Sequence, residues 1–166
     1  VAGDREMARA HCEDDLADAL YYGSGGNTGD GIRWGAELGG ALASMDAFQG
    51  HAPVPLTTYA VVMNGGVLVN AAGERFGNES KGYSQFAIDV VRQEGGVAYE
   101  LFDERIFERL QGEFDDFDRA IELGSYTSAD TVDALAAERG CDPEATREAV
   151  ESYNAAVEAG DTDEIG

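Results

Sequence analysis

The sequence predicts a single α+β domain, with several helices and a small mixed or antiparallel sheet. Two short apolar stretches, 66–70 and 97–102, have the length and the residue types of strands. Much of the rest shows helical spacing of apolar residues between clear capping residues. The chain has 166 residues, 43% of them hydrophobic, which is enough for one buried core. Since it contains no internal repeat and no linker, we expect one domain over residues 1–166.

The first fifty residues are expected to form two helices and one strand. A helix over 4–20 has an apolar side made of Met7, Ala10, Leu16 and Leu20. Residues 21–30 are rich in Gly, Ser and Asn, which predicts a loop. Asp30 can cap a second helix over 31–43. The poor helix formers of that helix indicate close packing on a neighbour: Gly35, Ala36, Gly39 and Gly40. Residues 45–49 predict a strand.

The middle of the chain predicts two strands with a helix between them. The first strand, 66–70, runs into a hairpin turn over 71–74 that leads to Arg75 and Phe76. A helix follows over 83–92 and is stopped by two glycines, Gly95 and Gly96. The second strand covers 97–102.

Four helices are expected in the last third. The segments 104–110 and 114–123 belong to a region with aromatic residues near helical spacings, which we expect in the core: Phe102, Phe107, Phe114 and Phe117. A third helix lies between the polar residues of 127–130 and Gly140. A fourth starts at Asp142 and Pro143, which suit the N-cap and the first turn, and ends before Gly160.

The charge of the chain is strongly negative, with 33 acidic residues against 11 Lys plus Arg and a net charge of −22. Such a surface repels nucleic acid and anionic lipid, so neither is an expected partner. Salt relieves the self-repulsion, because the Debye length falls to about 3 Å at 1 M. Together with a single lysine, Lys81, this favours a halophilic origin, and an acidic mesophilic protein is the alternative.

Several classes of site are missing from the sequence. Cys12 and Cys141 are too few for a disulfide framework and are read as free thiols. Only two histidines are present, which excludes a histidine-rich zinc site. The glycines of 23–26 lack the spacing and the preceding strand of a dinucleotide-binding motif. No apolar run approaches the roughly 20 residues of a membrane helix. With no secretory signal visible, the expectation is a cytoplasmic protein.

Four short segments carry a family resemblance: Asn27-Thr28-Gly29-Asp30-Gly31, Phe48-Gln49-Gly50-His51, Gly65-Gly66-Val67-Leu68-Val69-Asn70 and Arg75-Phe76-Gly77-Asn78-Glu79. Together they resemble the substrate-capping domain of the succinate dehydrogenase/fumarate reductase flavoprotein family. The resemblance implies a capping domain of a two-domain flavoprotein. Residues 1–31 would be the junction from the FAD-binding domain, which is absent from this chain, and 160–166 the return to it.

The first two segments imply cofactor and substrate contacts. By resemblance Asp30 would touch FAD, and Gly29 and Gly31 would let the backbone approach it closely; Asp30 could also cap its helix. His51, with Gln49 two residues before it, matches a segment whose histidine binds a substrate carboxylate or carbonyl. The plain alternative for His51 is an unspecialised loop histidine.

The resemblance also indicates how the chemistry departs from that of fumarate reductases. Thr58 falls where the family has a substrate-binding threonine, but Tyr59 and Val62 replace the Glu and Arg of a proton relay. Tyr83 stands where those enzymes have a catalytic arginine, which makes a dicarboxylate substrate doubtful. A tyrosine there resembles the 3-ketosteroid dehydrogenase branch, in which it moves a proton. Alternatively, Tyr83 starts a helix and packs on Phe86.

The sequence therefore predicts part of an FAD-dependent oxidoreductase that acts on a CH–CH bond beside a carbonyl or carboxylate. The expected partners are a small-molecule substrate and the FAD-binding domain of the same full-length protein, which would bind most of the FAD. The fragment alone is expected to be inactive. The alternative is a cap-derived binding or interaction domain without redox activity.

Overall fold

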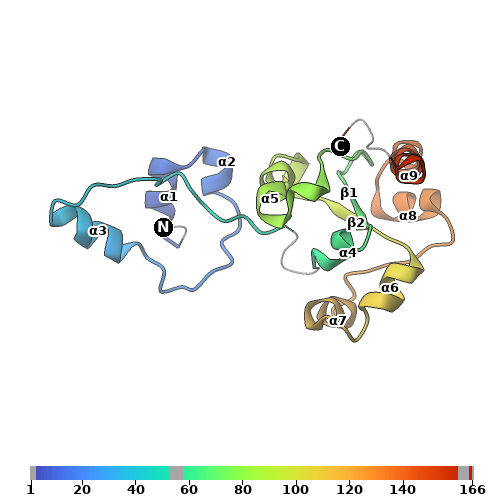
Figure 1. The fold of residues 1–166 in the computed structure, drawn as a ribbon, viewed down its shortest axis with the longest axis horizontal. Coiled ribbons are helices and arrows are strands. Elements are labelled where there is room, and N and C mark those ends of the chain that lie inside the picture. The colour runs from blue at the N-terminus through green and yellow to red at the C-terminus, as the bar shows by residue number, and fades with distance from the viewer. Residues whose placement is uncertain (1–2, 53–57, 161–164, 166) are drawn as a thin grey trace. The chain divides into compact units, whose positions relative to one another are not determined.

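The computed structural model describes residues 3–52, 58–160 and 165, and its chain divides into two compact units, 1–49 and 50–166. Figure 1 labels the helices and strands of both units. The sequence analysis expects one capping domain over 1–166, and whether the two units act as one domain in a longer protein stays a prediction.

The unit 1–49 contains three short helices: α1 (Arg5–His11), α2 (Asp14–Ala17) and α3 (Asp30–Glu37). The single helix expected over 4–20 is wrong, because the backbone is extended at Cys12 and Glu13. A second helix then begins with Asp14 and Asp15 in its first turn, where acidic side chains suit the helix dipole. Among the described residues of the unit 1–49, the buried hydrophobic ones are only Ala8 and Ala17.

The second half of this unit also differs from the prediction. The helix α3 ends at Glu37, because the chain turns back at Gly39, where φ is 86° and no side chain opposes that conformation. No residue of α3 is buried, so the expected close packing of its small residues is not observed in the described chain. The strand expected over 45–49 is wrong: a turn begins at Ser44, whose carbonyl accepts from the Ala47 amide at 3.1 Å.

The unit 50–166 is built on a two-stranded antiparallel sheet of β1 (Val67–Val69) and β2 (Tyr99–Leu101), in which Leu68 faces Glu100 across the ladder. This confirms both predicted strands and an α+β chain. The turn after β1 has Gly73 at φ 84°, where a Cβ atom would lie 2.7 Å from the carbonyl oxygen of Asp142. Only glycine therefore lets the start of the last helix pack against this turn.

The helices of this unit are α4 (Ala60–Met63), α5 (Tyr83–Val91), α6 (Glu104–Leu110), α7 (Asp115–Glu122), α8 (Val132–Arg139) and α9 (Pro143–Ala159), with 3₁₀ turns η1 (Glu79–Lys81) and η2 (Glu94–Gly96). Apart from α4, which the sequence did not predict, the helices begin and end close to their predicted capping residues and stop signals. The Asp142 carboxylate accepts from the amides of Glu144 and Ala145, and Gly140 and Gly160 end α8 and α9 with positive φ. Figure 1 shows α8 beside α9 and α4 near α6.

Two apolar clusters form the core of this unit. One joins α4 to α6 and α7 through Val61, Leu110 and Phe117, with Phe102 and Phe107 packed on it. The other joins Tyr59, Leu68 and Phe86 across β1 and α5. Of the four aromatic residues expected in the core, only Phe114 is exposed, because it stands at the N-cap of α7 rather than on the inner face of the helix.

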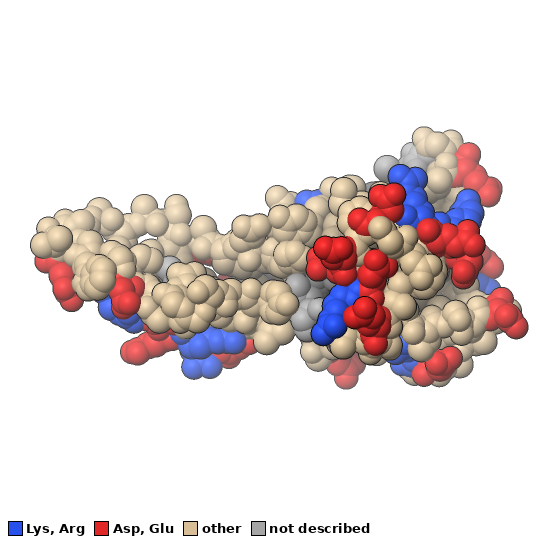
Figure 2. Space-filling view, turned by 90° about the horizontal axis from the view of Figure 1, so that it is seen from below, with Lys and Arg blue, Asp and Glu red and all other residues tan. Residues whose placement is uncertain are grey.

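Acidic side chains are scattered over both units on the face that Figure 2 shows, rather than gathered in one patch. This agrees with the even spread seen in the sequence. None of the helices in the described chain combines the length and the apolar character that a membrane crossing needs.

Candidate functional site

A cavity of about 620 Å³ lies in the unit 50–166. Four parts of the chain line it: α4, the start of β1, the segment 75–83 and α9. Its described lining is mostly apolar or aromatic and includes Val62, Met63, Tyr83, Tyr153 and Val157. A concave, mainly apolar cavity with a few polar groups is the usual form of a small-molecule site.

Tyr83 lines this cavity from the first residue of α5. Gly82 precedes it with φ 84°, a conformation that favours glycine and turns the chain into the helix. The side chain remains 38% exposed, so it can meet a ligand. Its ring lies 4.9 Å from the ring of His51 and 6.2 Å from that of Tyr59, measured between centroids. The structure thus brings together Tyr83 and His51, two residues that the sequence motifs assign to the same site.

Thr58 and His51 stand at the edge of this arrangement. Thr58 is half-buried, and its hydroxyl accepts from the Ala60 amide at 3.4 Å at the start of α4. His51 is exposed. Neither is among the described residues that line the cavity, so their substrate contacts stay predictions.

The other predicted residues belong to the unit 1–49: Gln49, Gly29, Asp30 and Gly31. The expectation that Asp30 caps α3 is wrong, because Gly29 is the N-cap and Asp30 is the first helical residue. The Asp30 carboxylate instead accepts from the Thr28 hydroxyl at 2.7 Å and pairs with Arg33 at 3.2 Å. No observed contact assigns these four residues to a cofactor or a substrate, so their roles remain predictions.

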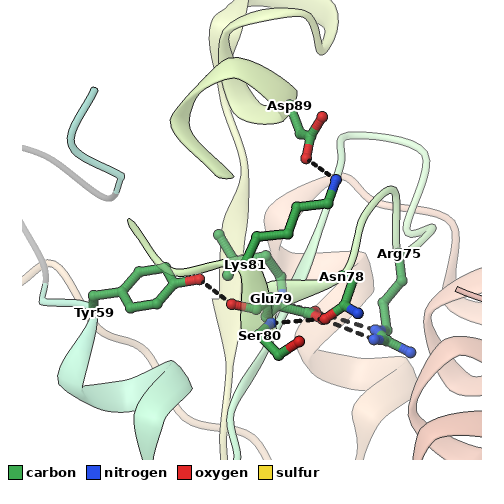
Figure 3. A network of polar contacts seen from close by, with 8 residues as sticks. Tyr59, Arg75, Asn78, Glu79, Ser80, Lys81 and Asp89 are labelled. Atoms are coloured by element: carbon green, nitrogen blue, oxygen red, sulfur yellow. Dashed lines mark hydrogen bonds and ion pairs between the residues drawn. The ribbon is translucent and has the colours of Figure 1, made fainter. Parts of the chain in front are cut away.

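The cavity contains a buried ion pair that the sequence analysis used only for recognition. The guanidinium of Arg75 donates to both carboxylate oxygens of Glu79, at 3.1 and 2.7 Å, and the side chains are 4% and 9% exposed. The Arg75 guanidinium also lies 4.9 Å from the ring centroid of Tyr153 on α9 (Figure 3 shows the pair with Glu79). The signal in the sequence was an Arg and a Glu four positions apart in one motif.

Tyr59 is the second cavity residue that the sequence analysis left without a role. Its hydroxyl donates to the backbone carbonyl of Glu79 at 2.5 Å, as Figure 3 shows. Burial, followed by the carboxylates of Glu79 and Glu100, raises the pKa of Tyr59 to about 12. Tyr59 therefore keeps its proton at neutral pH and acts as a hydrogen-bond donor.

The electrostatics of the cavity are those of a neutral site. Among the described residues that line it, the charged ones are Arg75 and Glu79, and they pair with each other. Val62 lines the cavity as well, with an uncharged side chain. A carboxylate ligand is held most strongly by charge-assisted hydrogen bonds, and the Arg75 guanidinium of the described lining is paired with Glu79. No group of three or more His, Cys, Asp or Glu residues in the described chain could hold a metal ion.

The family model of the FAD binding domain matches residues 2–161. The chain belongs to this family. Similar proteins include a fumarate reductase and a 3-oxosteroid 1-dehydrogenase, which confirms the resemblance to the fumarate reductase flavoprotein family. The family model is named for FAD binding and covers nearly the whole chain, whereas the sequence analysis places most FAD contacts outside it. The assignment of this chain to a capping domain therefore stays a prediction.

Two relatives of the FAD binding domain family show how far the similarity extends. A fumarate reductase (cytochrome) of Shewanella frigidimarina is 35% identical over 144 residues, covering 83% of this chain and 24% of the relative. A 3-oxosteroid 1-dehydrogenase of Mycobacterium tuberculosis is 31% identical over 158 residues, covering 83% and 28%. The chain thus spans about a quarter of the length of these relatives.

A solved structure supports the fold. The open conformation of a flavocytochrome c3 fumarate reductase matches with a TM-score of 0.71 at 24% identity, covering 96% of this chain and 28% of that one. At this identity the match establishes the fold and carries no residue roles.

Proposed function

We propose that this chain is the substrate-capping part of an FAD-dependent oxidoreductase that acts on a CH–CH bond beside a carbonyl or carboxylate. The observation that carries the proposal is Tyr83, half-exposed in an apolar cavity with the His51 ring 4.9 Å away. A relative of each kind, one named for fumarate and one for a 3-oxosteroid, matches the same chain. The neutral lining favours a carbonyl compound over a dicarboxylate.

In this function Tyr83 moves the proton. Removing hydrogen across a CH–CH bond beside a carbonyl needs a base for the proton on the carbon next to the carbonyl, and the Tyr83 oxygen takes it. A tyrosine with an ordinary pKa of about 10 is a weak base at neutral pH. A hydrogen-bond donor beside the tyrosinate would stabilise it, and the His51 ring lies 4.9 Å from the Tyr83 ring. A positioned base contributes typically 10²–10⁴-fold in rate. In the reverse direction the same oxygen returns the proton.

FAD, when bound, supplies the hydride acceptor or donor. The residues of the unit 1–49 that would face it fit a planar group: a Cβ atom added to Gly31 would have no heavy atom within 4 Å, so the backbone is open to close approach there. The Asp30 side chain is 56% exposed beside it. Most FAD contacts would come from the FAD-binding domain of the same full-length protein, so the fragment by itself is expected to be inactive.

The test uses the full-length protein purified in molar salt, with flavin absorbance as the readout. A panel of saturated ketones is expected to bleach the flavin, and Tyr83→Phe is expected to slow this bleaching by at least about 100-fold. Tyr99→Phe is the matched control, because it removes a tyrosine hydroxyl of the same unit outside the described cavity lining.

Two results would contradict the proposal. Bleaching by succinate that survives Tyr83→Phe would restore a dicarboxylate substrate and remove the proton role of Tyr83. A purified full-length protein without flavin would support the alternative of a cap-derived binding domain.

A further inference from the structure

Glu79 is held from three directions in the unit 50–166. Its carboxylate receives the Arg75 guanidinium, and one of the same oxygens accepts from the Leu68 amide of β1 at 3.1 Å. Its backbone carbonyl accepts from the Tyr59 hydroxyl at 2.5 Å. The whole residue is only 8% exposed. These contacts therefore fix the position of Glu79, and with it the start of the segment that leads to Tyr83.

Tyr83 lies four residues beyond Glu79. The Glu79 carbonyl that accepts from Tyr59 also accepts from the Gly82 amide at 3.2 Å. Both donors thus meet on one oxygen, which links Tyr59 to the residue directly before Tyr83. Farther on, the Tyr83 carbonyl accepts from the Ala52 amide at 3.3 Å.

Tyr59 touches Tyr83 a second time through its ring. The two rings meet edge to face with 6.2 Å between centroids, a favourable geometry for an aromatic pair. Tyr59 is 7% exposed and packs with Leu68 and Phe86, so its ring has a fixed position. One buried side chain thus contacts both the turn before Tyr83 and the ring of Tyr83.

We propose that Tyr59 is a positioning residue for Tyr83: its hydroxyl fixes the Glu79 carbonyl, and its ring fixes the direction in which Tyr83 enters the cavity. This inference rests on the proposed function of Tyr83 as the group that moves the proton. Tyr59 does not itself exchange a proton with the substrate. A positioned group loses much of its rate when its geometry changes by about 1 Å, so loss of this hydroxyl affects the chemical step more than binding.

The kinetic test compares two variants of the full-length protein with the wild type in molar salt, with a saturated ketone that bleaches the wild-type flavin. Tyr59→Phe removes one hydroxyl and keeps the ring, and it is expected to lower the limiting rate of flavin reduction about 5- to 10-fold. The ketone concentration at half-saturation is expected to change less than about twofold. Thr146→Val is the control, because it removes a buried hydroxyl bonded at 2.7 Å to the Asp142 carbonyl, away from the cavity lining.

A second measurement needs no substrate. Amide hydrogen exchange of a peptide covering 79–83 is expected to be about 5-fold faster in Tyr59→Phe than in the wild type, and unchanged in Thr146→Val. An unchanged rate and unchanged exchange in Tyr59→Phe would overturn the inference, and so would equal losses in Thr146→Val. If Tyr83→Phe keeps the full rate of flavin reduction, the proposed function of Tyr83 fails. The positioning contact is rejected separately, by amide exchange over 79–83 that is unchanged in Tyr59→Phe.

Discussion

The two units of this chain differ in where their large apolar side chains lie. In 50–166 residues such as Leu68, Phe86, Leu110 and Phe117 are at most 1% exposed. In 1–49 the large apolar side chains are mostly exposed, among them Leu20, Tyr22, Trp34, Leu38, Leu42 and Phe48. Since apolar burial is the dominant stabilising term, we infer that 50–166 supplies most of the stability of this chain.

The largest expected difference between the units comes from core truncation. In the 166-residue chain Phe117→Ala should lower the free energy of unfolding by about 3–5 kcal/mol, because Phe117 is fully buried between α6 and α7. Trp34→Ala should cost less than about 1 kcal/mol, because its side chain is 65% exposed. Urea unfolding in molar salt measures both. Equal losses would contradict the comparison.

The stability lost when an ion pair is broken should also be larger in the unit 50–166 than in the unit 1–49. Glu79→Gln leaves the buried Arg75 without its carboxylate partner, and a loss of about 3 kcal/mol is expected. Asp18→Asn breaks a pair with Arg9 whose side chains are 58% and 59% exposed, so the expected loss is below about 1 kcal/mol. Urea midpoints of the two variants and the wild type decide. A loss from Asp18→Asn as large as that from Glu79→Gln would show that exposure does not set the value of a pair here.

Alkaline pH should reveal the buried tyrosine. The pKa of Tyr59 is about 12 in the folded chain against its ordinary value of 10. Between these values the folded state keeps a proton that the unfolded state has lost, so stability falls as pH rises from about 10 to about 12, by at most about 3 kcal/mol. Tyr59→Phe should remove this part of the fall, and Tyr22→Phe, which alters an exposed side chain of the other unit, should leave it. Urea midpoints at pH 9 and 11 measure it, and an unaltered slope in Tyr59→Phe would refute the assignment.

The smallest expected effect concerns helix caps. Asp142→Ala should cost about 1 kcal/mol, because its carboxylate accepts two amides at the start of α9. Asp30→Ala should cost less, because Asp30 caps nothing and its contacts with Thr28 and Arg33 are exposed to solvent. Thermal unfolding at fixed salt compares the two. A larger loss from Asp30→Ala would mean that α3 depends on this carboxylate after all.

The accuracy of the sequence predictions also differs between the units. In 50–166 the helix α6 was predicted to the residue, and α9 starts and ends where Asp142, Pro143 and Gly160 indicate, because capping is a local property. In 1–49 the helix expected over 4–20 and the strand over 45–49 were wrong. The spacing of their apolar residues suggests one apolar side that would face a core. Since the described part of this unit buries almost no apolar residues, such a side has little to pack on.

The candidate site was predicted only in part. The motifs identified Tyr83 and His51, which the structure brings together. The contact between Tyr59 and Glu79 was not predictable, because it joins a hydroxyl and a backbone carbonyl that are twenty residues apart in the sequence and meet only in the fold.

The buried pair of Arg75 and Glu79 has a consequence for a protein with a net charge of −22. Dissolved ions screen charges on the surface strongly and buried charges much less. Changes in external salt should therefore alter the stability and solubility of the chain while the field inside the cavity stays nearly constant.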